Sequence, residues 1–270
     1  MHSRDLNGGT TAAPLIVEER IGDVAVLTLS DPATLNAASF EMVAQLRAAL
    51  DRAHVSARAI VLTGSGRGFC SGAKLSADLD IDSPQYDAGA ALDAYYNPLM
   101  LALRNSPIPI VTAVNGAAAG IGCNIALAGD IVIAAEDAYF LQAFRRIGLV
   151  PDGGSAYLLA HAVGRARAME LMLLGEKLPA DRALAWGLIN RTVPAEDLRS
   201  AALALAQDLA VGPTQALREI RRQCWAATES TFAETLEAER VQQRDVGRTA
   251  DHREGVAAFL AKRPAVFTGQ

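Results

Sequence analysis

Two glycine-rich segments, each placed directly after an apolar run of strand length, constrain the fold of this chain most. The first, at 68–73, follows the apolar run 59–62, and the second, at 116–124, follows the run 109–114. A glycine-rich turn between a strand and a helix leaves unpaired backbone N–H groups, with a partial positive charge, pointing outward. Two such turns that meet at one point would form an oxyanion hole, which stabilises charge developing on a carbonyl oxygen.

Strand-like and helical patterns alternate along the first two-thirds of the chain. Residues 15–20 and 24–29 predict a hairpin, and Ser39 predicts the N-cap of a helix over 40–53. We expect further strands at 59–62, 109–114, 130–135, 138–141 and 189–193, and helices at 90–104, 120–128, 154–162, 165–174 and 180–186. This alternation indicates an α/β fold with parallel strand pairing.

The two ends of the chain differ from this pattern. Residues 1–14 are polar and rich in small residues, which predicts a disordered tail. From residue 195 to about 263 the pattern is helical, with one expected break at Gly212-Pro213. Residues 78–89 lack periodicity and predict a mobile loop.

Composition excludes several classes of function. The net charge of −5 and the absence of a long Lys/Arg block argue against a nucleic-acid surface. Three cysteines cannot make a disulfide framework, and none lies at a metal-ligand spacing, so we expect no metal and a reducing cytoplasm. No apolar run reaches the length of a membrane span.

The two glycine-rich segments, in this order, resemble the signature of the crotonase (enoyl-CoA hydratase/isomerase) superfamily. The resemblance extends over about residues 15–267, and further matching segments lie at 35–37, 128–134, 147–154, 183–190 and 254–263. It implies a spiral of ββα units over 15–195 and a C-terminal helical region, 196–270, through which three or six subunits assemble. It also implies an acyl-CoA thioester substrate and no cofactor beyond the coenzyme A of that substrate.

The same resemblance assigns roles to individual residues. It places the two oxyanion N–H groups at Ala73 and Ile121. The substrate-binding residues that it implies are Leu35, Ala37, Ser71, Lys74, Leu75, Gly122, Asn124, Phe144 and Lys262, with Lys262 near the nucleotide phosphates and Phe144 lining the acyl pocket.

The acidic residues of the site decide between reactions. Hydratases of this family carry one Glu directly after the Gly-x-Gly-Cys element and a second four residues before the glycine of the Ile-Gly-Leu segment. Here these positions are Asn124 and Phe144. Neither an amide nor a phenyl ring can move protons between water and carbon, so hydration is disfavoured.

One acid remains near the expected cleft, Asp152. In an apolar pocket beside Phe144 its pKa should rise toward a working value. A single base opposite an oxyanion hole suits double-bond isomerisation, and the run 140–152 resembles the 1,2-epoxyphenylacetyl-CoA isomerase and Δ3,Δ2-enoyl-CoA isomerase branch, in which an Asp at this position is catalytic. Asp130, at the start of a strand, is expected to be structural.

Of three alternative functions, the sequence leaves two open and excludes the third. Asp152 could serve only as a helix cap in a non-catalytic acyl-CoA-binding protein. A hydratase would need a carboxylate from elsewhere in the chain. A dehalogenase of this fold needs a histidine base after the first glycine-rich segment, and no histidine lies between residues 55 and 160.

Overall fold

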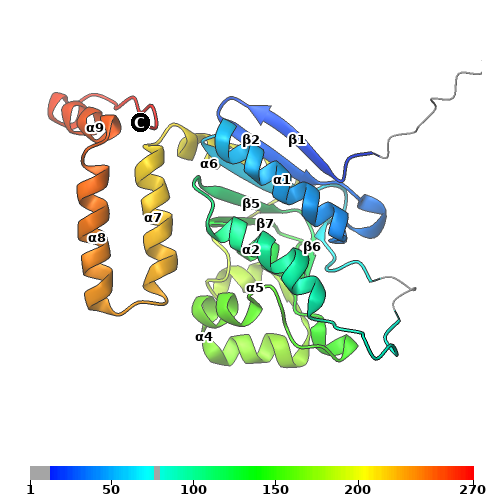
Figure 1. Cartoon of the computed structure of the whole chain (residues 1–270). Coiled ribbons are helices and arrows are strands. Elements are labelled where there is room, and N and C mark those ends of the chain that lie inside the picture. Colours follow the sequence, from blue (N-terminus) through cyan, green and yellow to red (C-terminus); the bar gives the residue numbers. More distant parts are fainter. Residues whose placement is uncertain (1–12, 76–79) are drawn as a thin grey trace, which may run out of the picture.

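The structure is a computed structural model that describes residues 13–75 and 80–270 (Figure 1). Most of the predicted tail at 1–14, and residues 78 and 79 of the predicted loop, therefore lie outside the described residues. Two β-sheets form the centre of the molecule, with strand orders β1-β2-β3-β5-β7-β10 and β4-β6-β8-β9. Helices surround both sheets.

The six-stranded sheet confirms the predicted hairpin and parallel pairing. β1 (Ile16–Ile21) and β2 (Val24–Leu29) are antiparallel, whereas the neighbours from β2 onward are all parallel. These are β3 (Ala59–Gly64), β5 (Ile110–Val114), β7 (Ile131–Ala135) and β10 (Arg191–Val193). Every residue of β5 is buried, as expected for a parallel strand that is covered on both faces.

The four-stranded sheet consists of three-residue strands, of which the sequence predicted only β8 (Tyr139–Leu141). The others are β4 (Gly68–Cys70), β6 (Ala117–Ala119) and β9 (Lys177–Pro179). The sequence predicted no strand within either glycine-rich segment, because β4 and β6 are too short, and too poor in large side chains, to show a period. Each of β3, β5 and β7 continues into β4, β6 or β8 of the second sheet, which gives a spiral of ββα units.

The connecting helices follow the predicted pattern closely. They are α1 (Phe40–Ser56), α2 (Asn97–Arg104), α3 (Ile121–Leu127), α4 (Ser155–Leu174) and α5 (Ala180–Ala185). Ser39 caps α1, since its side chain accepts the N–H of Met42. A π-helical turn, Leu92–Tyr96, precedes α2, and α4 is interrupted at Gly164, between the two helices that the sequence predicted.

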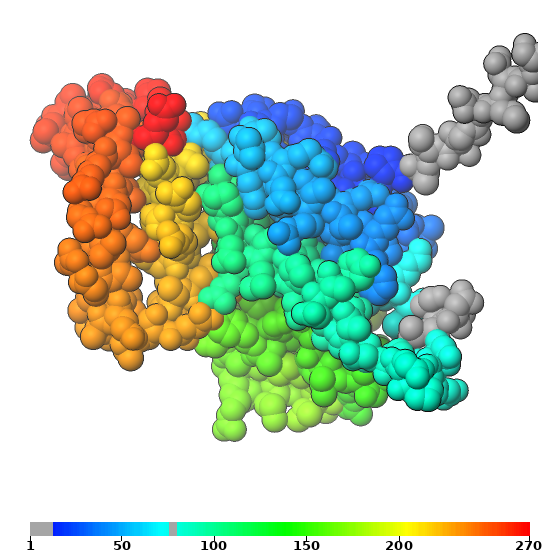
Figure 2. All heavy atoms as spheres, viewed as in Figure 1, coloured from blue at the N-terminus to red at the C-terminus, as the bar shows by residue number. Residues whose placement is uncertain are grey.

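The C-terminal helices divide into one that covers the sheet and three that project from it. α6 (Leu198–Ala210) packs on β2, β3, β5 and β7. α7 (Thr214–Ala227), α8 (Phe232–Val246) and α9 (Ala250–Ala261) form an arm beside the rest of the molecule (Figures 1 and 2). The predicted break at Gly212-Pro213 is confirmed, since it separates α6 from α7. Two further breaks, before α8 and α9, were not predicted and arise because Thr231 and Thr249 cap new helices.

Arg58 joins this arm to the sheet. Its guanidinium donates to the carbonyl oxygen of Gly212 at 2.6 Å, to Thr214 Oγ1 at 2.9 Å and to the carbonyl oxygen of Phe267 at 3.2 Å. The base of α7 and the C-terminal segment are therefore anchored at one point next to β3. Within the described residues, no helix is both long and apolar enough to cross a membrane.

Candidate active site

The two glycine-rich segments lie against each other. A Cβ built on Gly72 would be 3.1 Å from the carbonyl oxygen of Ala119 and 4.0 Å from Gly120 Cα. A Cβ on Gly122 would be 2.4 Å from the carbonyl oxygen of Cys70, so only glycine lets α3 pack this closely on the end of β4. Close backbone approach thus brings the N-terminus of α3 next to the chain that follows β4.

Each segment presents a backbone N–H at this junction. Ile121 is the first residue of α3, so its N–H has no acceptor within the helix. Ala73 forms an isolated parallel bridge with Ala38, in which Ala38 N–H donates to Gly72 and Lys74 N–H donates to Ala38. Both bonds use the neighbours of Ala73, and among the described residues the Ala73 N–H has no protein acceptor.

Tyr96 contacts the residue that pairs with the first of these segments, Ala38. Its hydroxyl donates to the carbonyl oxygen of Ala38 at 2.8 Å, and the ring is buried. The π-helical turn directs Tyr96 inward, and such turns often occur at functional sites. Burial, with a smaller contribution from the charge of Asp152, raises the pKa of Tyr96 to about 12, so its hydroxyl stays protonated as a donor.

Asp152 lies in the turn that leads into α4. Its Oδ1 atom is buried and has no hydrogen-bond partner within residues 13–75 and 80–270, and burial raises the pKa of the carboxyl to about 6. The N-cap of α4 is Gly154, and no side chain caps that helix end. The carboxylate therefore does not act as the helix cap that the sequence left open, and it titrates close to neutrality.

Asn124 and Phe144 occupy the positions where hydratases carry acids. The Phe144 ring packs on the second glycine-rich segment, because a Cβ on Gly120 would be 3.8 Å from its Cζ atom. Asn124 is fully buried, and its amide nitrogen donates to the carbonyl oxygen of Asp152 at 2.9 Å and to Ser155 Oγ at 2.7 Å. Neither side chain offers a titrating group.

The chain matches the family model described as enoyl-CoA hydratase/isomerase over residues 19–270. It belongs to the enoyl-CoA hydratase/isomerase family. One relative, the 1,2-epoxyphenylacetyl-CoA isomerase of Escherichia coli (strain K12), is 46% identical over 250 residues, covering 92% of this chain and 95% of the relative. A Rhodobacter capsulatus protein named "Probable enoyl-CoA hydratase" is also 46% identical, over 247 residues, with coverage of 92% and 95%.

A solved structure gives the same assignment for the fold. The crystal structure of an enoyl-CoA hydratase from Polaromonas sp. JS666 has a TM-score of 0.86 and 34% identity, covering 94% of this chain and 99% of that chain. The crotonase-like α/β fold predicted from the sequence is therefore confirmed, as is the resemblance to the family.

Several of the residues predicted to bind substrate surround the first glycine-rich segment of this family member. Ser71 N–H donates to the Leu35 carbonyl oxygen at 2.9 Å, and Ser71 Oγ donates to that of Thr34 at 2.8 Å. Ala37 is buried between them and the bridge at Ala38. These bonds tie residues 34–38 to the segment that carries Ala73.

The other residues predicted to bind substrate are less closely grouped. Leu75 is 63% exposed, and Lys74 Nζ lies 3.9 Å from Asp31 Oδ2 in a half-exposed pair. Gly122 is buried within α3. Lys262 follows α9 in the projecting arm, on the opposite side of Figure 1 from residues 73–75, so one copy of the chain does not bring it to the others.

Four residues that shape the site were not singled out from the sequence: Asn36, Tyr96, Gln142 and Ser155. The side chain of Asn36 is fully buried and donates to the carbonyl oxygens of Ser65 and Gly68. It thereby fixes the 31–36 turn on the loop before β4. Asn36 and Gln142 stood inside matching segments, as polar residues among apolar ones, and that pattern could have indicated buried amides.

Asp130 has the structural role expected for it. Its Oδ2 atom accepts the N–H of Ile110 at 2.7 Å and Arg221 Nε at 2.6 Å. Arg221, from α7, also donates to the carbonyl oxygens of Leu103 and Ser106. The pair locks the arm to the start of β7, away from the glycine-rich segments.

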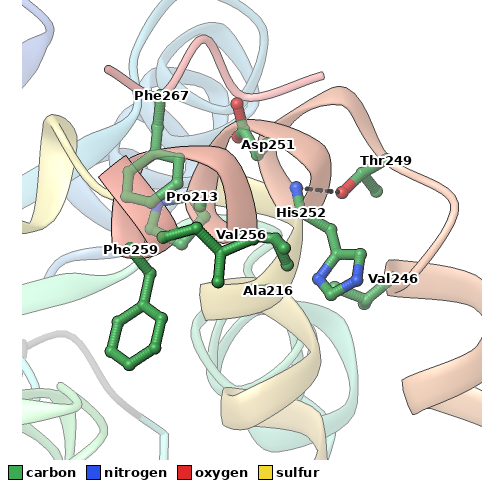
Figure 3. Close-up of a pocket in the computed structure, with 11 residues that line it drawn as sticks. Pro213, Ala216, Val246, Thr249, Asp251, His252, Val256, Phe259 and Phe267 are labelled. Carbon is green, nitrogen blue, oxygen red and sulfur yellow. Dashed lines mark hydrogen bonds between the residues drawn. The ribbon is translucent and has the colours of Figure 1, made fainter. Parts of the chain in front are cut away.

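Two cavities of the described residues lie in the arm, and neither is lined by the predicted catalytic residues. An apolar pocket of about 420 Å³ lies at the base of the arm, between α7 and α9, and Figure 3 shows Val256 and Phe267 on its wall. A more polar groove of about 900 Å³ separates α7 from α8 (Figure 2). In residues 13–75 and 80–270, no group of three or more His, Cys, Asp or Glu side chains could hold a metal ion.

Proposed function

We propose that this chain is an acyl-CoA isomerase that moves a double bond, or rearranges a ring epoxide, through a thioester enolate. Asp152 removes a proton from a carbon of the acyl group, and the electron pair moves to the thioester oxygen. The N–H groups of Ala73 and Ile121 stabilise the negative oxygen. Asp152 then returns the proton to another carbon, so no water is consumed.

The observation that carries this proposal is the single unpartnered carboxylate. Among the described residues, Asp152 Oδ1 is buried without a hydrogen-bond partner, and the two positions where hydratases carry acids are Asn124 and Phe144. One base with a pKa of about 6 can accept and return a proton near neutral pH. The name of the Escherichia coli relative, an isomerase of 1,2-epoxyphenylacetyl-CoA, supports the same reaction class.

The residues expected to hold coenzyme A belong to the same proposal. Leu35, Ala37 and Ser71 would offer backbone contacts beside Ala73, and Phe144 would line the acyl pocket. Lys74 is half-exposed at the rim, where its ammonium could reach a phosphate. Lys262 could contribute only from the arm of another copy of the chain.

Assembly through the arm is the corresponding proposal for the C-terminal region. Phe259, Leu260 and Val266 are at least 72% exposed, and Phe232 on α8 is 79% exposed. Large apolar side chains gathered on a projecting element are typical of a subunit interface. A trimer or hexamer would bury these side chains. Light scattering of the purified protein measures the number of subunits and so tests the assembly.

The decisive experiment follows proton exchange at carbon. The α and γ protons of 3-enoyl-CoA and ring-epoxyphenylacetyl-CoA are monitored by NMR in deuterated water with the wild type, Asp152→Asn and the control Asp137→Asn. Asp137 is an exposed acid outside the site. We expect exchange or double-bond migration that the control retains and Asp152→Asn loses.

Two other outcomes would each lead to a different function. Water addition that survives in Asp152→Asn would indicate a hydratase that uses another acid. Tight binding of both thioesters without exchange in any variant would indicate a non-catalytic acyl-CoA-binding protein.

A further inference from the structure

Three buried polar side chains beside Asp152 form a closed ring of hydrogen bonds. Asn124 Nδ2 donates to Ser155 Oγ at 2.7 Å, Ser155 Oγ donates to Gln142 Oε1 at 3.1 Å, and Gln142 Nε2 donates to Asn124 Oδ1 at 3.1 Å. The three residues are at most 2% exposed. Within the ring each side chain donates once and accepts once. Ser155 Oγ also lies 2.8 Å from the carbonyl oxygen of Asp152, and its single hydrogen serves either that oxygen or Gln142 at one time.

The ring uses one of the two hydrogens of the Asn124 amide, and the other reaches the backbone of Asp152. The second hydrogen on Asn124 Nδ2 points to the Asp152 carbonyl oxygen at 2.9 Å, which also accepts the Ser155 N–H at 3.0 Å. This contact fixes the orientation of the Asn124 amide, because its oxygen could not face a carbonyl oxygen. A carboxylate at position 124 would have no hydrogen to offer there.

The ring joins three separate segments of the chain. Asn124 belongs to α3, Gln142 follows β8 and Ser155 begins α4. Asn124 also lies one turn after Ile121 on the same face of α3. The turn with Asp152 rests on that face, since a Cβ on Gly153 would be 2.2 Å from Ile121 Cδ1 and 3.2 Å from Asn124 Nδ2.

We propose that Asn124, Gln142 and Ser155 are positioning residues that fix the Asp152 base relative to the N-terminus of α3. The ring holds the backbone of Asp152, whose carboxylate makes no hydrogen bond to any residue that the structure describes. It thereby sets the separation between the base and the oxyanion donor Ile121. The inference rests on the proposed function, in which these two groups act on one thioester.

The pKa of Asp152 and the rate of the reaction distinguish a positioning role of the ring from a purely structural one. Without the ring, the turn at Asp152 can relax and its carboxylate can reach water. The loss of desolvation would bring the pKa of Asp152 back toward the ordinary value of about 3.9. A base displaced by about 1 Å typically loses about 100-fold in rate, with little effect on substrate binding.

The test uses two variants and one control in the full-length protein. Ser155→Ala removes the hydroxyl that closes the ring, and Gln142→Met removes the second amide at similar volume. Thr112→Val is the control, because Thr112 is fully buried on β5 and its hydroxyl has no hydrogen-bond partner among the described residues. The pKa of Asp152 is followed by carbon NMR of labelled aspartate carboxyls, with Asp152→Asn to assign the signal.

We expect both ring variants to lower the pKa of Asp152 by at least one unit, and to lower kcat about 10- to 100-fold with KM nearly unchanged. The control should keep both values. An unchanged pKa together with wild-type kcat in the folded variants would overturn the proposal. If the pKa falls in a protein whose wild type lacks isomerase activity, the ring positions Asp152 and the proposed function fails instead.

Discussion

Two partly buried aspartates, Asp130 before β7 and Asp152 before α4, differ in the groups that surround their carboxyls. Burial raises the pKa of both carboxyls. Asp130 has a compensating cation, Arg221, and the N–H of Ile110, which oppose that rise. Asp152 has no such partner in the part of the chain that the structure describes, and its Oδ1 atom makes no hydrogen bond there.

This difference in partners predicts a role in stability for Asp130 and a role in chemistry for Asp152. A carboxylate paired with a buried arginine and a backbone N–H connects elements of the fold, here the arm and the sheet, and its partners oppose its action as a base. A buried carboxylate without partners costs stability but can exchange a proton near neutral pH. We therefore expect two residues of the same type to have different roles, because the groups around them differ.

The largest expected effect is on the activity of the unpaired acid. Asp152→Asn should lower the isomerase rate about 10²- to 10⁴-fold, the usual contribution of a positioned base. Steady-state kinetics with 3-enoyl-CoA measure the loss, and Asp137→Asn serves as the matched exposed control. A rate within threefold of the wild type would place the base elsewhere.

The paired acid should respond in stability and not in chemistry. Arg221→Met removes the cation that Asp130 faces and leaves a buried carboxylate alone, so the free energy of unfolding should fall by about 3–5 kcal/mol. Denaturant titration at pH 7 measures it. Asp152→Asn should be at least as stable as the wild type, because it removes a charge that lacks a partner. A loss of stability in Asp152→Asn equal to that in Arg221→Met would remove the contrast.

The pH dependence sharpens the contrast further. The pKa of Asp152 is about 6 in the folded chain, above its value of about 3.9 when unfolded, so between these values only the folded chain holds the proton. The contribution of this group to stability is therefore fully present below pH 4 and is lost as the pH rises to about 6. Activity should follow the opposite course, rising through pH 6 to a plateau as the base ionises.

Comparison of wild type and Asp152→Asn isolates both curves. The difference in their melting temperatures should change between pH 4 and pH 6 and stay constant above. A wild-type activity profile with no inflection between pH 5 and 7 would contradict a base of this pKa.

The roles of the two aspartates were partly predictable from sequence. Asp152 follows an apolar run and precedes a helix, and Asp130 starts a strand, which placed both near buried ends of elements. The strands and helices with large apolar side chains, such as β5 and α1, were predicted within a few residues, because their periods are long enough to read. The hydroxyl caps of Thr231 and Thr249 were overlooked in a continuous helical pattern.

The remaining features depend on contacts between distant segments. The partner of Asp130 is Arg221, 91 residues away, and nothing local distinguishes Arg221 from the exposed Arg222 beside it. The ring around Asp152 joins residues 124, 142 and 155, whose side-chain directions follow from the packing of α3 on α4. The short strands β4 and β6 exist because they pair with each other and not because of their own propensity.

The smallest expected effect tests whether distance alone makes an ion pair important. Arg52 and Glu18, on α1 and β1, approach to 2.6 Å, the same distance as Arg221 and Asp130. Their side chains are 58% and 40% exposed, against 6% and 19% for the buried pair. Water and salt screen such a surface pair, so Arg52→Ala should leave the melting temperature unchanged within experimental error. If Arg52→Ala destabilised the chain as much as Arg221→Met, separation and not burial would govern these pairs, and the distinction between Asp130 and Asp152 would lose its physical basis.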